Sequence, residues 1–458
     1  MSNTKHNIRP GAWLKDYGML LVLLALMAVL SLATIDRQQS SGSAAGRELA
    51  EQILASESPQ NLLVVTPEGK LDIEMATVFV EALAGSEHEV LAVVHGGPVQ
   101  AREALAGIGA LETRLDVLVT TDTASRWDPV GKTASNLPEF ENLASRRLLL
   151  PSSYTWPDFL MPDNLVTIAQ RIAILAILAI GMTMVILTAG IDLSVGSLIA
   201  LSAVITGVLI RDVAGGTEAG AIGMTVAAMG GIAACGAAGF STGVLVAAFR
   251  LPPFIVTLAM MLIIRGVANV ISDQRTIHEI PASFEVLGKG YVMGIPYSVL
   301  LMFALYGVAH FVMTRTTLGR QIYAVGGNAE AARLSGVMVQ RVQLIVYTVC
   351  GLLAGLGGVL LASQLRSAKA SYGLMDEMTV IAAVVVGGTS LMGGEGRILG
   401  TLIGALIIGV IQNGMNLIHM DDKTQMIVLG SVILLAVLLD RIKKGHVNWS
   451  DVRGTFRR

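Results

Sequence analysis

Four amide side chains near the ends of apolar runs are the first candidates for chemistry in this sequence: Asn269, Gln412, Asn413 and Asn416. An amide both donates and accepts hydrogen bonds, which suits contact with a neutral molecule rich in hydroxyl groups. The same amides could instead tie neighbouring helices together. We therefore treat the four residues as a candidate substrate pathway, with helix-to-helix bonding as the alternative.

Two charged residues lie within or beside apolar runs, where a charge is costly and normally has a partner. Asp192 begins one such run, so its carboxylate could cap the helix formed by that run, with substrate contact as the alternative. Arg265 stands in the middle of another run and needs a counter-group. The pattern makes Asp192 and Arg265 a candidate intramembrane polar pair.

The sequence lacks the patterns that nucleotide hydrolysis or metal catalysis requires. Nowhere does Gly-x-x-x-x-Gly-Lys-Ser/Thr occur, no His or Cys cluster has metal-ligand spacing, and no carboxylates pair inside an apolar run. Cys235 and Cys350 fall in apolar runs and are interpreted as small core residues. His278, His310 and His419 are isolated and are interpreted as interfacial polar groups. We expect no metal, no cofactor bound by this chain and no enzymatic activity of its own.

A polar, arginine-bearing segment, residues 316–336, interrupts the apolar two-thirds of the chain. Its basic residues predict a cytoplasmic location by the positive-inside rule. Asn328 can cap a short helix with Glu330 in its first turn and Arg333 near its last, and Gly336 can end it. A helix this short cannot bury itself and needs a partner, unless the segment is only a solvated linker.

Membrane helices must position all these groups. Of the 458 residues, 53% are hydrophobic and only 14% are charged, which is typical of a polytopic α-helical membrane protein. About ten spans are expected, at residues 19–33, 168–189, 193–210, 220–249, 253–271, 294–313, 342–362, 378–391, 398–417 and 426–439. An even number places both termini in the cytoplasm, in agreement with a basic tail at residues 441–458.

Two local patterns refine this arrangement. The run 378–391 is short and is followed by Gly393 and Gly394, so a pair of half-spanning helices is an alternative there. Glycines four residues apart predict close helix contacts in lipid rather than chemistry. They occur as one pair at Gly351 and Gly355 and another at Gly400 and Gly404.

The residues after the first run have a different character. Lys5, Arg9 and Lys15 precede that run, which is either a retained first helix or a cleaved signal peptide; in both cases the next segment is exported. Strand-like runs at residues 61–66, 89–95 and 116–121 then alternate with helical ones at 44–55, 73–83 and 99–108. This alternation predicts βαβ units, and hence a small extracytoplasmic α/β domain over residues 36–155.

Three motifs stand in order along the apolar part of the chain. They are Gly190-Ile-Asp-Leu-Ser-Val-Gly-Ser197, Gly319-Arg-x-x-x-Ala-x-Gly-Gly-Asn-x-x-Ala-Ala-x-x-Ser-Gly336 and Gly387-Gly-Thr-Ser-Leu-Met-Gly-Gly-Glu-Gly-Arg397. Together with the first helix and residues 158–444 around them, they resemble the permease subunits of ribose-type (simple-sugar) ABC importers. Residues 36–155 depart from that pattern as an unusual insertion, to which the resemblance assigns no role.

The resemblance implies partners and a location. It implies an ABC ATPase subunit that binds ATP with Mg, a periplasmic sugar-binding protein, a second permease subunit, identical or not, and membrane lipid, but no nucleic acid. It implies a multi-pass protein of the bacterial inner membrane that imports a pentose or hexose, with the insertion on the periplasmic side. The implied ATPase-coupling loop comprises Gly319, Arg320, Gly326, Gly327, Asn328, Glu330, Ala331, Ala332, Ser335 and Gly336.

Two other functions remain open from the residues alone. An ion-coupled secondary transporter would need titratable groups or broken helices at mid-membrane, for which Asp192 and Arg265 are the candidates. A membrane-anchored sensor would bind its ligand in the insertion. The predicted organisation is a cytoplasmic N-terminus and first helix (1–35), the insertion (36–155), an ABC permease transmembrane domain (156–440) and the basic cytoplasmic tail (441–458).

Overall fold

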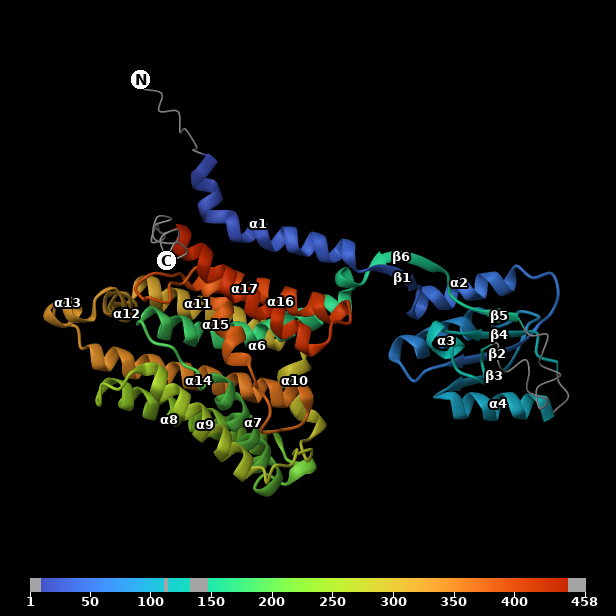
Figure 1. Ribbon diagram of the computed structural model, residues 1–458. Coiled ribbons are helices and arrows are strands. Elements are labelled where there is room, and N and C mark those ends of the chain that lie inside the picture. The colour runs from blue at the N-terminus through green and yellow to red at the C-terminus, as the bar shows by residue number, and fades with distance from the viewer. Residues whose placement is uncertain (1–9, 111–113, 132–146, 444–458) are drawn as a thin grey trace, which may run out of the picture. The chain divides into compact units, whose positions relative to one another are not determined.

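The computed structural model describes residues 10–110, 114–131 and 147–443. The predictions made for Lys5, Arg9 and residues 444–458 of the basic tail lie outside these ranges. The chain forms two compact units, one comprising residues up to Thr34 together with those from Asp158 onward, the other Ile35–Pro157 (Figure 1).

Helices build almost all of the first unit. They are α1 (Pro10–Ala33), α6 (Pro162–Leu187), α7 (Val195–Asp212), α8 (Ala221–Ala247), α9 (Pro253–Ile271), α10 (Glu285–Lys289), α11 (Tyr297–Arg315), α12 (Thr317–Gly327), α13 (Ala329–Leu334), α14 (Val339–Leu365), α15 (Asp376–Val386), α16 (Ile398–Leu417) and α17 (Asp422–Lys443). Within the described residues, α6, α7, α8, α9, α11, α14 and α16 are the seven helices that are long and apolar enough to cross a membrane. This unit is therefore a polytopic helical membrane protein.

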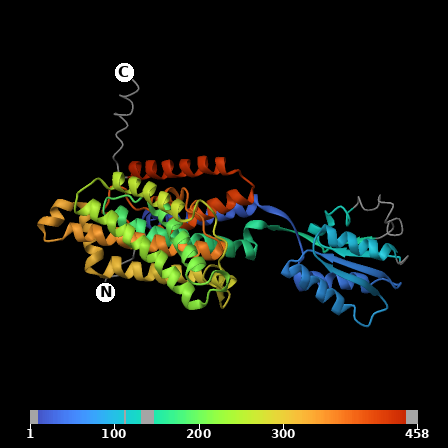
Figure 2. The ribbon, with the colours of Figure 1, turned by 90° about the horizontal axis from the view of Figure 1, so that it is seen from below.

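The other three expected spans have different outcomes. Residues 19–33 fall in α1 and residues 426–439 in α17, which runs along one side of the bundle (Figure 2). The run 378–391 is not one helix, because α15 has 11 residues and ends at Val386. Eleven residues extend roughly 16 Å, about half of a 30 Å apolar core. Helix α15 is therefore about half-spanning, but the described residues after it form no second half-spanning helix, since α16 has 20 residues. The total of ten spans stays a prediction.

The core of this unit is α6, which packs against α11, α14, α15 and α16 and is buried on nearly all sides. Glycines let the surrounding helices approach closely, as the sequence predicts. A Cβ on Gly351 of α14 would overlap the Cys235 carbonyl oxygen of α8, and one on Gly404 of α16 would overlap the Ala383 carbonyl oxygen of α15. Both cysteines are free and buried, in agreement with a core role.

The second unit contains β1 (Ile35–Gln39), α2 (Gly42–Leu54), β2 (Asn61–Thr66), α3 (Lys70–Ala82), β3 (Glu89–His95), α4 (Pro98–Ala110), β4 (Val117–Thr120), α5 (Asp122–Ser125), β5 (Arg147–Leu149) and β6 (Ser153–Pro157). In the described residues, β3, β2, β4 and β5 form a parallel sheet in that order. Strands β1 and β6 form a separate antiparallel ribbon.

Alternation along β2 explains why the sheet has helices on both faces. Leu62 and Val64 pack with α2 and α3, whereas Leu63 and Val65 pack with α4 (Figure 1). Successive side chains of a strand point to opposite faces, so a strand that is apolar throughout is buried on both. The sheet is thus the middle of three layers.

Candidate functional site

The segment 316–336 folds into α12 and α13, each started by a side-chain cap. The Thr316 hydroxyl oxygen accepts a hydrogen bond from the Gly319 amide at 3.3 Å, and Asn328 Oδ1 accepts one from the Ala331 amide at 2.9 Å. These bonds satisfy amides that lack a partner within the first turn of a helix. Gly336 takes a left-handed φ of +84° just after α13. The short capped helix that the sequence predicts is formed.

Little of α13 is buried within its own chain. Ala332 is buried, but Leu334 is 79% and nearby Met338 55% exposed. Arg333 forms a 2.6 Å ion pair with Glu330, and both side chains face solvent. Arg320, Ala331 and Ser335 are exposed as well. The exposed surface of α13 and the start of α14 therefore carries both apolar and charged side chains.

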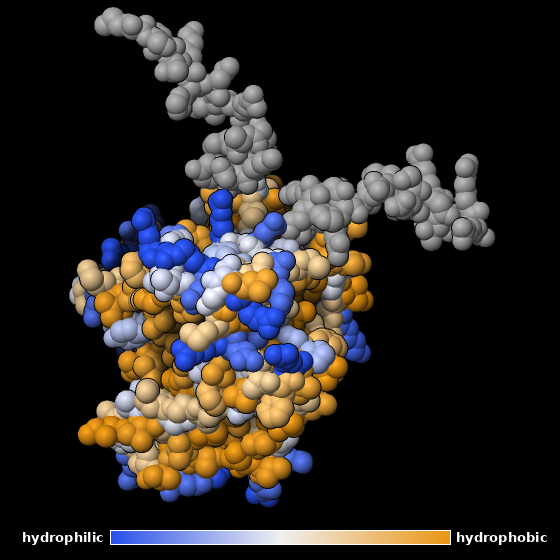
Figure 3. All heavy atoms as spheres, turned by 90° about the vertical axis from the view of Figure 1, so that its left-hand side faces the viewer, coloured by the Kyte–Doolittle hydropathy of each residue, from blue (hydrophilic) through white to orange (hydrophobic). Residues whose placement is uncertain are grey.

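A groove of about 870 Å³ lies beside α13. It runs between the α13–α14 segment and the turn joining α8 to α9, and its charged lining residues are Arg250, Glu330, Arg333 and Arg341. Figure 3 faces the end of the molecule that bears α12 and α13, and shows hydrophilic side chains crossing this face among apolar ones. The basic excess of the groove favours an acidic or mixed-charge protein partner.

Two of the three sequence motifs, 319–336 and 387–397, meet at the end of α6, which lies just before the third motif at 190–197. The Gly394 amide donates to the Leu187 carbonyl oxygen at the end of α6 at 3.0 Å, and the Tyr323 hydroxyl of α12 donates to the Gly396 carbonyl oxygen at 2.9 Å. A Cβ on Gly326 would overlap the Leu187 carbonyl oxygen, whereas Gly327 faces open space. We call this contact between the ends of α6 and α12 and the turn 393–396 the inner junction.

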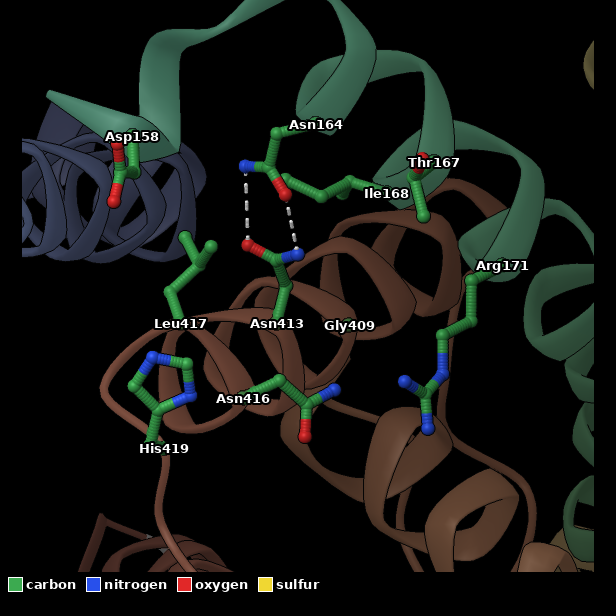
Figure 4. A pocket seen from close by; sticks show the side chains of 10 residues that line it. All are labelled: Asp158, Asn164, Thr167, Ile168, Arg171, Gly409, Asn413, Asn416, Leu417 and His419. Atoms are coloured by element: carbon green, nitrogen blue, oxygen red, sulfur yellow. Dashed lines mark hydrogen bonds between the residues drawn. The ribbon is translucent and has the colours of Figure 1, made fainter. Parts of the chain in front are cut away.

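The opposite end of α6 borders a cavity of about 330 Å³ (Figure 4). Asn164 of α6 and Asn413 of α16 point at each other, with nitrogen-to-oxygen distances of 2.8 and 3.3 Å. Asn416 accepts a hydrogen bond from Gln425 at 2.9 Å. Asn413 and Asn416 thus tie neighbouring helices together and also line the cavity. The lining residues are Asp158, Asn164, Thr167, Ile168, Arg171, Gly409, Asn413, Asn416, Leu417 and His419.

A second cavity, of about 180 Å³, continues from the first. It shares Arg171 and Gly409 with the first cavity, and Gln412 lines it together with Asp376 of α15. The two cavities therefore bring Gln412, Asn413 and Asn416 to one region, which we call the amide cavity. Arg171 is basic, whereas Asp158 and Asp376 are acidic, so charges of both signs line this region.

The fourth amide, Asn269, does not line the amide cavity. It lies on α9 and donates to the carbonyl oxygen of Arg265, one turn earlier in the same helix, at 2.9 Å. The structure thus separates Asn269 from Gln412, Asn413 and Asn416, and shows it bonded within its own helix.

Asp192 and Arg265 do not form the expected pair. Arg265 donates to the carbonyl oxygens of Ala370 and Tyr372, both at 2.6 Å, because the non-helical segment before α15 passes beside its guanidinium. Asp192 accepts from the amide and hydroxyl of Ser194, just before α7, at 2.9 and 2.6 Å. Arg265 thus bonds to the backbone of a distant segment, whereas Asp192 bonds to a residue two positions along the chain.

Sequence reasoning missed three residues of the amide cavity: Asn164, Arg171 and Asp376. A signal existed for Arg171, since a charge within the apolar run 168–189 marks a polar path. Asn164 gives no such signal, because its importance lies in its bond to a residue 249 positions away.

A bundle of membrane-crossing helices with a polar cavity at one end and an exposed capped helix at the other is the architecture of a multi-pass transport protein. Residues 164–437 match the family described as the permease component of branched-chain amino acid transport systems. The chain belongs to this family. Its members are transport subunits, so this chain is a permease subunit and not an enzyme.

Individual relatives agree with this family. The chain is 46% identical to the ribose import permease protein of Escherichia coli (strain K12) over 292 residues, 63% of this chain and 88% of the relative. It is 43% identical to that of Bacillus subtilis (strain 168) over 290 residues (63% and 87%). It is 38% identical to the L-arabinose ABC transporter permease protein of Azospirillum brasilense over 296 residues (64% and 84%). These matches confirm the family indicated by the motifs. No solved structure matches the chain.

Proposed function

We propose that this chain is the membrane-spanning permease subunit of an ATP-driven importer of simple sugars, a pentose or hexose, in a bacterial inner membrane. The inner junction carries the proposal, because two of the family motifs, 319–336 and 387–397, meet there at the end of α6, next to an exposed, capped helix. Sugar relatives at 37–46% identity support the substrate class.

ATP with Mg would be held by a separate ATPase subunit that docks on α13 and the adjacent groove. Movement of α13 reaches α12 across Asn328, and α12 abuts Leu187 of α6 through Gly326. Because α6 is one continuous buried helix, a shift at Leu187 displaces Asn164 and Arg171 at its other end. The ATPase thus biases the bundle between two arrangements that open the amide cavity to different sides.

The amide cavity is the proposed substrate pathway. Gln412, Asn413, Asn416 and Asn164 offer donors and acceptors for hydroxyl groups. The site need bind only weakly, since a periplasmic sugar-binding protein would hold the substrate before delivery. A second permease subunit would complete the pathway.

The second unit, Ile35–Pro157, would lie on the periplasmic side, with α13 and both chain ends in the cytoplasm. Its place on the receiving side motivates a contact with the sugar-binding protein, and a spacer or stability role is the alternative. Deleting residues 39–151 separates the two: a docking role requires that uptake falls while assembly with the ATPase persists. Unchanged uptake would exclude docking.

Reconstitution tests the main proposal. The purified chain in proteoliposomes should accumulate sugar only when the ATPase subunit, ATP and the binding protein are all present. Uptake driven by an ion gradient without the ATPase would instead indicate a secondary transporter. Ligand binding by the second unit without uptake under any of these conditions would indicate a sensor.

A further inference from the structure

The segment between α14 and α15 turns back into the helical bundle. Residues 366–375 are not helical, and Gly373 and Met375 both have a left-handed φ of +67°. Gly373 lies against the start of α7, because a Cβ on it would overlap the Gly196 carbonyl oxygen. The first turn of α15 therefore lies inside the bundle, and its position depends on how this segment is held.

Arg265 of α9 holds this segment. Its guanidinium donates to the carbonyl oxygens of Ala370 and Tyr372, both at 2.6 Å, and its second terminal nitrogen lies 3.5 Å from the carbonyl oxygen of Gly373. The positive charge of Arg265 also attracts Glu377, whose side chain is buried in the first turn of α15. Arg265 thus fixes the backbone just before α15 and has a counter-charge just after the helix begins.

Asp376 lies between these two contacts and lines the amide cavity. Among the described residues that line the second cavity, it is the one acid and Arg171 is the one base. Arg171 points from α6 into the space between the helices (Figure 4), and it is close enough to Asp376 for their charges to attract each other. A carboxylate only accepts hydrogen bonds and a guanidinium only donates them, whereas an amide does both. Asp376 and Arg171 therefore require hydroxyl groups in a defined orientation, which the cavity amides do not.

We propose that Asp376 contacts the substrate by accepting a hydrogen bond from a sugar hydroxyl group, and that Arg265 is the residue that positions Asp376 for this contact. Arg171 offers a donor to the oxygen of the same or an adjacent hydroxyl group. A site built around such bonds rejects a sugar that lacks the hydroxyl group, because its charged groups would stay desolvated without a partner. This inference rests on the proposed function, since it names a contact within the proposed substrate pathway.

Protection of a cysteine in the cavity measures sugar binding in the full-length chain without the ATPase or the binding protein. Leu361 of α14 lines the second cavity and is uncharged and apolar, so Leu361→Cys places a reporter thiol there. Cys235 and Cys350 are buried, and the chain without the reporter gives their background. The probes are two pentoses, D-ribose and L-arabinose, and two hexoses, D-allose and D-fructose. The concentration of the best probe that halves the rate of modification by N-ethylmaleimide reports its affinity.

The contact is tested by Asp376→Asn, which keeps the shape of the side chain and removes its charge. This variant should raise the half-protecting concentration roughly tenfold, because hydrogen bonds to a charged group are the stronger ones. Asp422→Asn is the matched control, since Asp422 is also an acid in the first turn of a helix but lines neither cavity. An unchanged concentration in Asp376→Asn, or no protection by any of the four sugars, would overturn the contact. The assay contains no ATP, so its failure is distinct from a failure of ATP-driven uptake.

The positioning role is tested by combining substitutions. Arg265→Gln should raise the half-protecting concentration when Asp376 is present, but by less than about twofold in the Asp376→Asn chain, because residues that act through one another are not additive. Arg265→Lys keeps the charge and its donors and should recover most of the affinity. A rise by the same factor in both chains would show that Arg265 acts independently of Asp376 and overturn this role. If Arg265→Gln does not fold, Arg265→Lys in the same two chains applies the same criterion.

Discussion

The two ends of α6 are built in different ways. At Leu187 the helix end is closed by backbone groups, with Gly326 and Gly394 pressed against it and a 3.0 Å amide-to-carbonyl bond across the contact. At Asn164 and Arg171 the same helix borders cavities, and long polar side chains make the contacts. Backbone contacts tolerate little rearrangement, whereas side chains can change partners.

This difference matches the two tasks that a permease divides between its faces. A junction that transmits a conformational change must be tightly packed, because a loosely packed contact would rearrange instead of moving the next helix. A pathway must let hydroxyl groups replace internal hydrogen bonds, so its amides need partners that can be exchanged. The comparison predicts that substitutions at the inner junction cost both stability and uptake, whereas those in the amide cavity cost uptake with little loss of stability.

The largest effect is expected at Gly326. Its replacement by alanine forces a Cβ into the Leu187 carbonyl oxygen, and such overpacking costs about 1–3 kcal/mol. Gly326→Ala should therefore lower the thermal unfolding temperature in detergent and abolish uptake. Gly327→Ala is the matched control, because a Cβ there meets nothing within 4 Å. Equal behaviour of the two variants would show that the inner junction is not tightly closed.

The cap of α13 comes next. Asn328→Ala removes the 2.9 Å bond to the Ala331 amide and should destabilise α13 by about 1 kcal/mol, because that amide loses its acceptor. The helix is local and exposed, so the whole protein should keep its unfolding temperature while the ATPase activity measured with the partner subunit falls. Asn328→Asp keeps a capping oxygen and should restore most of that activity. Loss of ATPase activity in both variants would mean that the side-chain amide of Asn328 is needed, and not only its capping oxygen.

The amide cavity should show the opposite balance. Asn416→Ala removes a cavity amide, and Gln425→Ala breaks the same 2.9 Å hydrogen bond without changing the cavity lining. Each should cost roughly 0.5–1 kcal/mol of stability or less, as expected for one partly exposed hydrogen bond. If Asn416 contacts substrate, only Asn416→Ala should raise the KM for uptake several-fold. A matching rise in Gln425→Ala would assign Asn416 to tying α16 to α17.

Local interactions explain what the sequence can predict here. The start and end of α13 follow from Asn328 and Gly336, whose effects extend only a few residues. The glycine pairs predict close helix contacts without identifying the partner helix. Arg265 is different, since its partners depend on where the non-helical segment before α15 passes. The apolar run of the sequence continues to Leu391, but α15 already ends at Val386. The helix ends there because Gly387 lies against the backbone of Gly400 and Thr401. Such contacts between distant residues cannot be read from periodicity.

The smallest effect on stability is expected for the exposed ion pair of α13, and for that reason it isolates the role of the partner. Glu330 and Arg333 are 65% and 61% exposed, so their pairing should contribute only roughly 0.2–0.5 kcal/mol to the helix. Glu330→Gln should therefore leave unfolding unchanged, and any loss of uptake then reflects a contact outside this chain.

Exchanging the two residues, Glu330→Arg with Arg333→Glu, keeps an ion pair but reverses the charges that a docked ATPase would meet. A collapse of ATP-driven uptake in the exchanged protein, at normal stability, is the expected result. Full activity would mean that the docking surface does not include these two side chains.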